Sequence, residues 1–519
     1  MTLLKEYSYK QGAALSVGAT FIWKIFSFVN SILIAYYFGT QTRSDIYFYV
    51  ISIAGTIIFF FNSLNNNVLI PQAIFLRKND EDSAKNFLNL FLLLYLLILT
   101  IAILICFIFP IDIFKIISNF SVNILNQDIL ILRLAFLYFF SYVLCSFILN
   151  IMYIYRIFSI NILFPLNALL PMSFLILFHN TLGLKTMLIG FITSHFIQIF
   201  ICFYTMKKKL NWNFSHFKIS IEQRFKNNFI TNQLLVIIDC MIAMLPVYLM
   251  SSFSKGIISA LSYSKQLMDA PSEIVSTKII QVYHIQLNEN ASTKDFNALN
   301  ANYLKINYLI LFIIVPLSLF TCYFAPDIID LFFKRGKFDT ESANNVVLFL
   351  RPMMIVLIID ALFSSAGNVI ASTRKIKESF KYMLLKAIIS LIIIYSIISY
   401  FGPFSYPYAH ICYSLLTYLI LSVFFKKYIP QINFWQPLKY SVLLISLNLI
   451  ALIPSAFVAK ILQNQNVFIK IFLCGIIFLF VLTLLYIPTK QFKKILPPLL
   501  GLQYKTFLNK TPNCLKKFI

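Results

Sequence analysis

Several ionisable side chains of this chain interrupt long apolar stretches, where a charge is costly unless it meets water or a partner. Lys265, Asp269 and Glu273 follow one another at intervals of four residues, so they would share one face of a helix. A charged stripe of this kind cannot face lipid. We expect it to line a watery cavity, and the alternative is a set of ion pairs that only hold neighbouring helices together.

Other apolar stretches also contain ionisable residues, namely Lys24, Asp239, Lys386 and, within one stretch, Arg351 and Asp360. Lys24 follows Phe21, Ile22 and Trp23 in the middle of its stretch. It is too far from either end for easy snorkelling to the membrane surface, which is the alternative interpretation. We therefore expect Lys24 to face a cavity or a partner inside the membrane. Asp239 and Lys386 could instead form a buried pair.

The elements that carry these charges are long apolar segments. A bilayer core of about 30 Å needs a helix of roughly 20 apolar residues, and about fourteen segments of that size follow one another along the chain. Of the 519 residues, 60% are hydrophobic and 12% are charged, and the mean hydropathy is +0.81. The sequence thus predicts an all-α polytopic membrane protein with helices at 13–38, 44–70, 84–109, 127–155, 159–178, 182–206, 227–251, 257–285, 303–325, 342–371, 379–400, 404–427, 438–461 and 465–487.

The excess of basic residues gives a formal net charge of +24. In a membrane protein such an excess marks cytoplasmic loops and favours anionic lipid headgroups, so no nucleic-acid partner is expected. With the N-terminus in the cytoplasm, most basic clusters fall on the cytoplasmic side. An even number of helices returns the basic tail after 487 to the same side. We predict that both termini are cytoplasmic.

The longest linkers suggest where the chain divides. The segment 207–226 follows the sixth predicted helix and is the best candidate hinge. This places an N-terminal lobe at 1–226 and a second lobe at 227–430. The last two helices and the basic tail occupy 431–519.

The loops lack the signatures of catalysis. We find no nucleophile elbow, zinc-protease motif or phosphate-binding glycine loop. The eight cysteines include no C-x-x-C pair and indicate no metal site. The sequence therefore favours a transporter over an enzyme, without a bound cofactor.

Four short motifs give the chain a family resemblance. Phe38-Gly39 is followed by Asp45, and Leu69-Ile70-Pro71 is followed by Arg77-Lys78. Leu261-Ser262-Tyr263 leads to Pro271. Leu331 to Asp339 reads L-F-F-K-R-G-K-F-D, and the following segment ends in Ala371-Ser372-Thr373-Arg374. In this order the motifs resemble the MurJ/MviN-type lipid II flippases of the multidrug/oligosaccharidyl-lipid/polysaccharide exporter superfamily.

The resemblance implies two six-helix lobes around a central cationic cavity, and two further helices that form a groove for lipid tails. It implies a flippase that moves an undecaprenyl-diphosphate-linked oligosaccharide, lipid II, across the bacterial cytoplasmic (inner) membrane by alternating access. The expected partners are this lipid-linked oligosaccharide and membrane lipids, and the expected state is a monomer. The expected substrate-binding residues are Lys24, Asp45, Lys265, Asp269, Glu273 and Arg351. Arg335 and Asp45 are the candidate gate.

The chain departs from the family at the cavity arginines. The matching positions are Lys24, which keeps the charge, and Asn30, Ile58 or Phe59, and Gln266, which lose it. Lysine lacks the bidentate fork of arginine, so diphosphate binding would be organised differently. An O-antigen or exopolysaccharide unit on a polyprenyl carrier is therefore an open alternative to lipid II.

Some family members also hold a sodium ion, and Asp239 matches one of its ligands. The other ligand positions are near Ile392 and Ser396, so a pair between Asp239 and Lys386 could replace the ion. Coupling to sodium or to the membrane potential stays open. A cation-coupled multidrug exporter and a membrane enzyme acting on polyprenyl glycans are the remaining alternatives.

Overall fold

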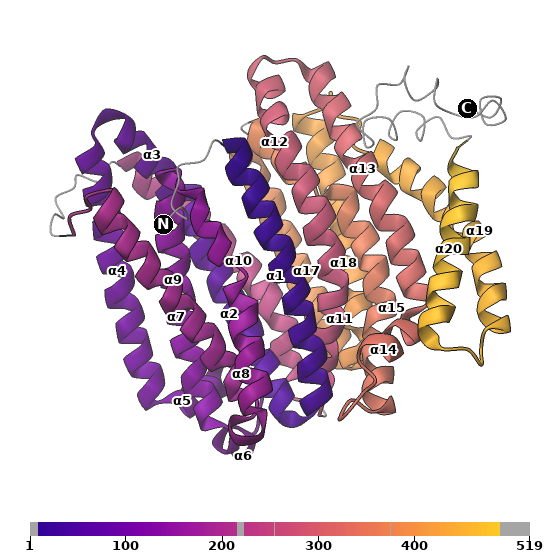
Figure 1. Ribbon diagram of the computed structural model, residues 1–519. Coiled ribbons are helices and arrows are strands. Elements are labelled where there is room, and N and C mark those ends of the chain that lie inside the picture. The colour runs from indigo at the N-terminus through magenta and orange to yellow at the C-terminus, as the bar shows by residue number, and fades with distance from the viewer. Residues whose placement is uncertain (1–8, 215–222, 254, 374, 488–519) are drawn as a thin grey trace. The chain divides into compact units, whose positions relative to one another are not determined.

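The structure is a computed structural model that describes residues 9–214, 223–253, 255–373 and 375–487 (Figure 1). Within these ranges the chain forms helices joined by short loops, and no strand is present. The predicted all-α membrane class is confirmed. The basic tail after 487 lies outside the described residues.

The predicted helices correspond closely to the observed ones. The first half contains α1 (Tyr9–Phe38), α2 (Thr42–Leu64), η1 (Asn65–Leu69), α3 (Ile70–Asn79), α4 (Glu81–Ile108), α5 (Pro110–Ile117), α6 (Val122–Gln127), α7 (Ile129–Ile154), η2 (Phe158–Leu163), α8 (Leu166–Leu182), α9 (Lys185–Lys209) and α10 (Gln223–Met250). The second half contains α11 (Ile257–Pro271), η3 (Ser272–Ser276), α12 (Thr277–Ser292), α13 (Phe296–Tyr323), α14 (Ala325–Phe332), α15 (Thr340–Phe363), α16 (Ala366–Ser372), α17 (Ile376–Phe401), η4 (Pro403–Ser405), α18 (Tyr406–Tyr428), α19 (Gln436–Ile461) and α20 (Val467–Tyr486).

Among the described residues, 13 helices are long and apolar enough to cross a membrane. The predicted eighth span, now α11 with η3 and α12, is not among them. This segment carries Lys265, Asp269 and Glu273, which lower its mean hydropathy. The count of fourteen stays a prediction.

The chain forms two compact units. Unit 1 comprises 1–262, 335–342 and 394–403, and unit 2 comprises 263–334, 343–393 and 404–519. Neither unit is one continuous stretch of chain. The division into lobes at 1–226 and 227–430 stays a prediction.

In unit 1, α7 is the central helix and packs against α2, α4 and α9. Its apolar side chains are buried on several faces, as Leu132, Phe147 and Ile148 show. A helix that is apolar on all sides is suited to this position. The helix α10 packs against α2 in the same unit.

In unit 2, α13 packs against α12 and α19, and α19 and α20 form a neighbouring antiparallel pair (Figure 1). The short helix α14 packs against α20 of this pair. On α13, Ile310 and Ile314 are fully buried. This packing gathers the loop ends of α13, α19 and α20 in one region of unit 2.

Two helices contain a π-helical turn beside a proline. The turn Asn65–Leu69 precedes Pro71, and the turn Ser272–Ser276 follows Pro271. Proline has no N–H group and disturbs the hydrogen bonding of a regular helix. Single π-helical turns are often found at functional sites, and the second of these carries Glu273.

Candidate functional site

Asp45 joins the beginning of α2 to the beginning of α11 within unit 1. Its carboxylate accepts hydrogen bonds from the backbone N–H of Gly256 at 2.6 Å and of Ser259 at 2.8 Å. The Ser259 hydroxyl donates a third, at 2.6 Å. Asp45 is 4% exposed. The first N–H groups of a helix lack partners within the helix and carry partial positive charge, so this carboxylate caps α11 from another segment.

The loop that carries the strongest sequence motif closes against the turn between α1 and α2. The N–H of Lys337 donates to the carbonyl of Tyr36 at 2.9 Å. Gly39 and Gly336 both have positive φ, of 57° and 60°. A Cβ on Gly39 would lie 2.4 Å from the Lys337 carbonyl oxygen, and one on Gly336 would lie 2.4 Å from that of Tyr36. The two glycines allow the backbones to touch.

The same loop also sets the beginning of α15. The carboxylate of Asp339 accepts a hydrogen bond from the N–H of Ser342 at 2.8 Å. This bond lowers the pKa of Asp339 below its ordinary value. The hydroxyls of Ser342 and Thr40 are 2.6 Å apart. The motif from Arg335 to Asp339 therefore carries charge and also fixes the start of α15.

The gate prediction paired Arg335 with Asp45. The hydrogen bonds that Asp45 accepts come from Gly256 and Ser259. The Arg335 loop meets the first turn through the backbone of Lys337 instead. A pair between Arg335 and Asp45 stays a prediction, and it would require Asp45 to leave α11.

Beside this contact, unit 1 contains a polar pocket of about 610 Å³. Its basic residues are Arg43, Lys185 and Lys337, and its acidic residue is Asp128. Arg43 and Asp128 form an ion pair, with Nε and Oδ1 3.6 Å apart. Burial raises the pKa of Asp128, and the charges of Arg43 and Lys185 act in the opposite direction.

The pocket also offers groups that suit a sugar. The rings of Tyr37 and His179 are stacked with centroids 3.9 Å apart, and the amides of Gln41, Gln127 and Asn180 line the same space. Aromatic faces with nearby hydrogen-bonding groups suit ligands that have both an apolar and a polar side. Sequence reasoning did not identify this pocket, because its residues come from four separate connections and the helix ends beside them.

Lys24 lies in the middle of α1 and is half-buried. Its amine is 4.7 Å from the centre of the Trp23 ring. Asn30, one turn and a half further along, is buried and donates to the Ala168 carbonyl at 2.9 Å. The position that loses the family charge thus serves packing between α1 and α8, while Lys24 keeps its cation.

In unit 2 the predicted charged stripe begins with Lys265, whose amine lies 5.7 Å from the centre of the Tyr406 ring. Lys265 and Asp269 are half-buried and Glu273 is exposed. Because Glu273 lies in the π-helical turn, the helical spacing of the stripe changes there. A cavity lined by the whole stripe stays a prediction.

A second polar group of unit 2 joins α15 to α18. His410 Nε2 lies 3.5 Å from Asp360 Oδ2, and the Ser414 hydroxyl donates to Asp360 Oδ1 at 3.2 Å. The His410 ring also stacks on Tyr413 at 4.5 Å. The sequence analysis named Asp360, but helical spacing within one segment does not show which residues of two distant helices meet.

The remaining predicted residues belong to three different helices, α10, α15 and α17. Arg351 is exposed on α15 and lines a pocket of unit 2. Asp239 belongs to unit 1, where its side chain is exposed, and Lys386 belongs to unit 2. The buried pair between these two residues stays a prediction.

Comparison with solved structures defines the fold class of the protein. A structure of the lipid II flippase MurJ, in an inward closed conformation, has a TM-score of 0.73 and 18% identity, and the match covers 91% of this chain and 99% of that one. An inward-facing multidrug resistance MATE family transporter of the MOP superfamily has a TM-score of 0.58 and 13% identity, with coverage of 78% and 96%. The chain shares the polytopic α-helical fold of these two proteins.

Sequence comparison narrows the class to a family. A family model described as "Lipid II flippase MurJ" matches residues 34–482. A curated protein of Borreliella burgdorferi, "Probable lipid II flippase MurJ", is 23% identical over 405 residues, which are 76% of this chain and 79% of that protein. The chain belongs to the lipid II flippase MurJ family, and it is a transporter rather than an enzyme.

Proposed function

We propose that this protein moves a polyprenyl-diphosphate-linked oligosaccharide, with lipid II as the first candidate, from the cytoplasmic to the outer leaflet of the bacterial cytoplasmic membrane. The observation that carries the proposal is the match of the MurJ family model over residues 34–482. The protein would act as a monomer with both termini in the cytoplasm.

The chemistry of the substrate explains why cations are needed. A diphosphate is costly to move through a low-dielectric layer unless cations and water accompany it. Lys24 on α1 and Lys265 on α11 are half-buried cations. Each has an aromatic ring beside its amine, Trp23 in one case and Tyr406 in the other. A neighbouring aromatic ring stabilises a cation, and both amines would attract the substrate phosphate.

Alternating access would use the contacts near Asp45. In the described arrangement Asp45 is occupied by α11. A pair with Arg335 would therefore form only after these hydrogen bonds break. The polar pocket with Tyr37 and His179 would meet the sugar portion of the substrate at this end of unit 1.

The energy source separates two versions of the proposal. Asp239 is the candidate sodium ligand, and the membrane potential is the alternative source. A multidrug exporter is the second class of function, because the chain also shares its fold with the MATE transporter. The MATE transporter has a lower TM-score and coverage than the MurJ structure. We therefore favour the lipid-linked substrate.

Depletion of the protein in its native cells tests the proposal. If it moves lipid II, the peptidoglycan precursor accumulates in the inner leaflet and cells lose wall integrity. If it moves another polyprenyl glycan, that glycan accumulates while lipid II stays at its normal level. If neither lipid-linked precursor accumulates while cells become sensitive to cationic drugs, the protein is an exporter.

A further inference from the structure

Unit 2 contains a pocket of about 670 Å³ where α13, α15, α19 and α20 meet. Three basic side chains line it, Arg351, Lys460 and Lys470, together with one acidic side chain, Asp327. Leu319 and Leu449 are among its apolar residues. The pocket thus joins an apolar wall to an excess of positive charge.

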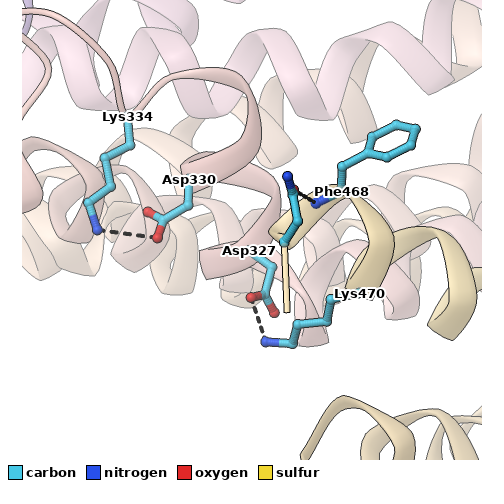
Figure 2. Close-up of polar contacts among 6 residues, drawn as sticks. Asp327, Asp330, Lys334, Phe468 and Lys470 are labelled. Atoms are coloured by element: carbon cyan, nitrogen blue, oxygen red, sulfur yellow. Dashed lines mark hydrogen bonds and ion pairs between the residues drawn. The ribbon is translucent and has the colours of Figure 1, made fainter. Parts of the chain in front are cut away.

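One of the three cations is already neutralised. Lys470 Nζ lies 2.6 Å from Asp327 Oδ1, and the dashed line in Figure 2 marks this pair. Their side chains are 17% and 22% exposed. The neighbouring pair of Lys334 with Asp330, at 3.2 Å, belongs to α14 and its loop. The contacts of α14 with α20 therefore use one cation of the pocket for structure.

The other two cations are not neutralised. In the described part of the chain, neither Arg351 nor Lys460 makes a hydrogen bond or an ion pair with another residue. Both side chains are exposed. An arginine on a membrane helix is rare and normally pairs with an anion or lines a watery space. The excess charge of the pocket therefore calls for an anion from outside the chain.

Position along the helices indicates what kind of anion this is. Arg351 is the twelfth residue of α15, about 16 Å along the helix axis from Thr340 at 1.5 Å per residue. Lys460 is the next-to-last residue of α19. Arg351 therefore lies near the middle of α15 (Thr340–Phe363), whereas Lys460 lies at a helix end, close to the depth of lipid headgroups. The long side chain of Arg351 can extend towards that depth within the pocket that both residues line. The apolar wall formed by Leu319 and Leu449 suits an acyl or prenyl chain.

We propose that this pocket binds the phosphate of a membrane lipid, with Arg351 and Lys460 as its ligands. The guanidinium of Arg351 can hold two phosphate oxygens at once. The amine of Lys460 adds a second charge-assisted hydrogen bond, and the pair of Lys470 with Asp327 fixes the rim. This site goes beyond the transport proposal, because it does not depend on which glycan is moved.

Native mass spectrometry of the full chain in detergent tests the site. The probes are phosphatidylglycerol, undecaprenyl phosphate, and diacylglycerol as the ligand without phosphate. We expect both phosphate lipids, or one of them, to bind tightly and diacylglycerol to bind at least about tenfold more weakly, as the loss of charge-assisted hydrogen bonds implies. Preference for undecaprenyl phosphate would assign the site to the carrier lipid, and preference for phosphatidylglycerol would assign it to the bulk membrane.

Variants locate the binding. Arg351→Gln combined with Lys460→Gln should weaken phosphate-lipid binding at least about tenfold. Lys439→Gln, which removes an exposed cation at the other end of α19, should leave it unchanged. Asp327→Asn frees Lys470 and should strengthen binding. Unchanged binding in the double variant, or equal binding of diacylglycerol by the wild type, would overturn the proposal.

A second measurement does not depend on the folding of variants. Wild-type protein is crosslinked to a photoactivatable phosphatidylglycerol and to a photoactivatable polyprenyl phosphate, and the modified peptides are identified. Labelling should fall on the segments around Leu319, Leu449 and Arg351. Labelling spread evenly over all membrane helices would contradict a built site.

Discussion

Asp45 and Ser259 are joined twice, because one carboxylate oxygen of Asp45 accepts from both the N–H and the hydroxyl of Ser259, at 2.8 and 2.6 Å. The other oxygen accepts from the N–H of Gly256 at 2.6 Å. These contacts occupy the carboxylate with donors from α11. They give Asp45 a clear physical role in unit 1.

Substituting Asp45 should therefore destabilise the protein even though no substrate is present. In Asp45→Asn an amide N–H₂ group must face an N–H donor, so at least one buried donor loses its acceptor. The expected loss in the free energy of unfolding is about 1–3 kcal/mol. Thermal unfolding in detergent measures it. Ser259→Ala, which removes one hydroxyl donor, should cost less, and equal stability of Asp45→Asn and the wild type would contradict this role.

Gly39 and Gly336 should not tolerate alanine. Each has positive φ, and a Cβ would lie 2.4 Å from a backbone carbonyl oxygen. We expect Gly39→Ala and Gly336→Ala each to lower the free energy of unfolding by more than the roughly 1 kcal/mol of a left-handed conformation alone. Gly402→Ala is the matched control, because Gly402 has φ of 82° and no atom within 4 Å of its Cβ position. If all three variants lose the same free energy of unfolding, the close backbone contacts are not the reason that glycine is required at positions 39 and 336.

The capping by Asp339 should depend on pH. Its hydrogen bond to Ser342 lowers the pKa of Asp339 below the ordinary value of 3.8. The carboxylate therefore contributes stability that is fully present above about pH 4 and is lost as the pH falls through the lowered pKa. Asp339→Ala should cost about 1 kcal/mol at pH 7, and the difference from wild type should shrink towards pH 2.

Thermal unfolding at pH 7 and at pH 2–3 measures this effect. Asp339→Asn is the control, since asparagine caps a helix but does not titrate in this range. Its stability relative to alanine should stay nearly constant with pH. A wild-type advantage over alanine that is undiminished in acid would show that the cap does not act through the carboxylate.

Lys24 should be required for transport and dispensable for folding. Its amine is half-buried in α1 beside Trp23, and we propose that it attracts the substrate phosphate. Lys24→Ala should lower the transport rate at least tenfold, about 1.4 kcal/mol in the barrier, with unchanged thermal unfolding. Lys24→Arg should keep most of the rate. Full activity of Lys24→Ala would remove this residue from the mechanism.

The helices could be predicted from the sequence because about 20 apolar residues in a row have few other stable arrangements. The predicted spans 84–109 and 438–461 match α4 (Glu81–Ile108) and α19 (Gln436–Ile461) within a few residues. The π-helical turns were missed. They change hydrogen bonding by one residue without changing hydropathy, and Pro71 and Pro271 were the only local signal.

The site was less predictable, because it depends on which helices meet. Asp45 was expected to face Arg335 or substrate, and no periodicity in α2 indicates that Ser259 is its partner. Arg351 was predicted as a binding residue. Lys460 lies more than a hundred residues away and is unremarkable by itself, so sequence alone did not join them in one pocket.

Transbilayer movement of lipid II in liposomes that contain the purified protein tests the central claim most directly. Labelled lipid II is placed in one leaflet, and its appearance in the other is followed with an impermeant quencher. We expect the protein to accelerate this movement far above the rate in protein-free liposomes, and Lys24→Ala to return it close to that rate. Equal rates with and without the wild-type protein, for lipid II and for other polyprenyl-linked glycans alike, would contradict the account.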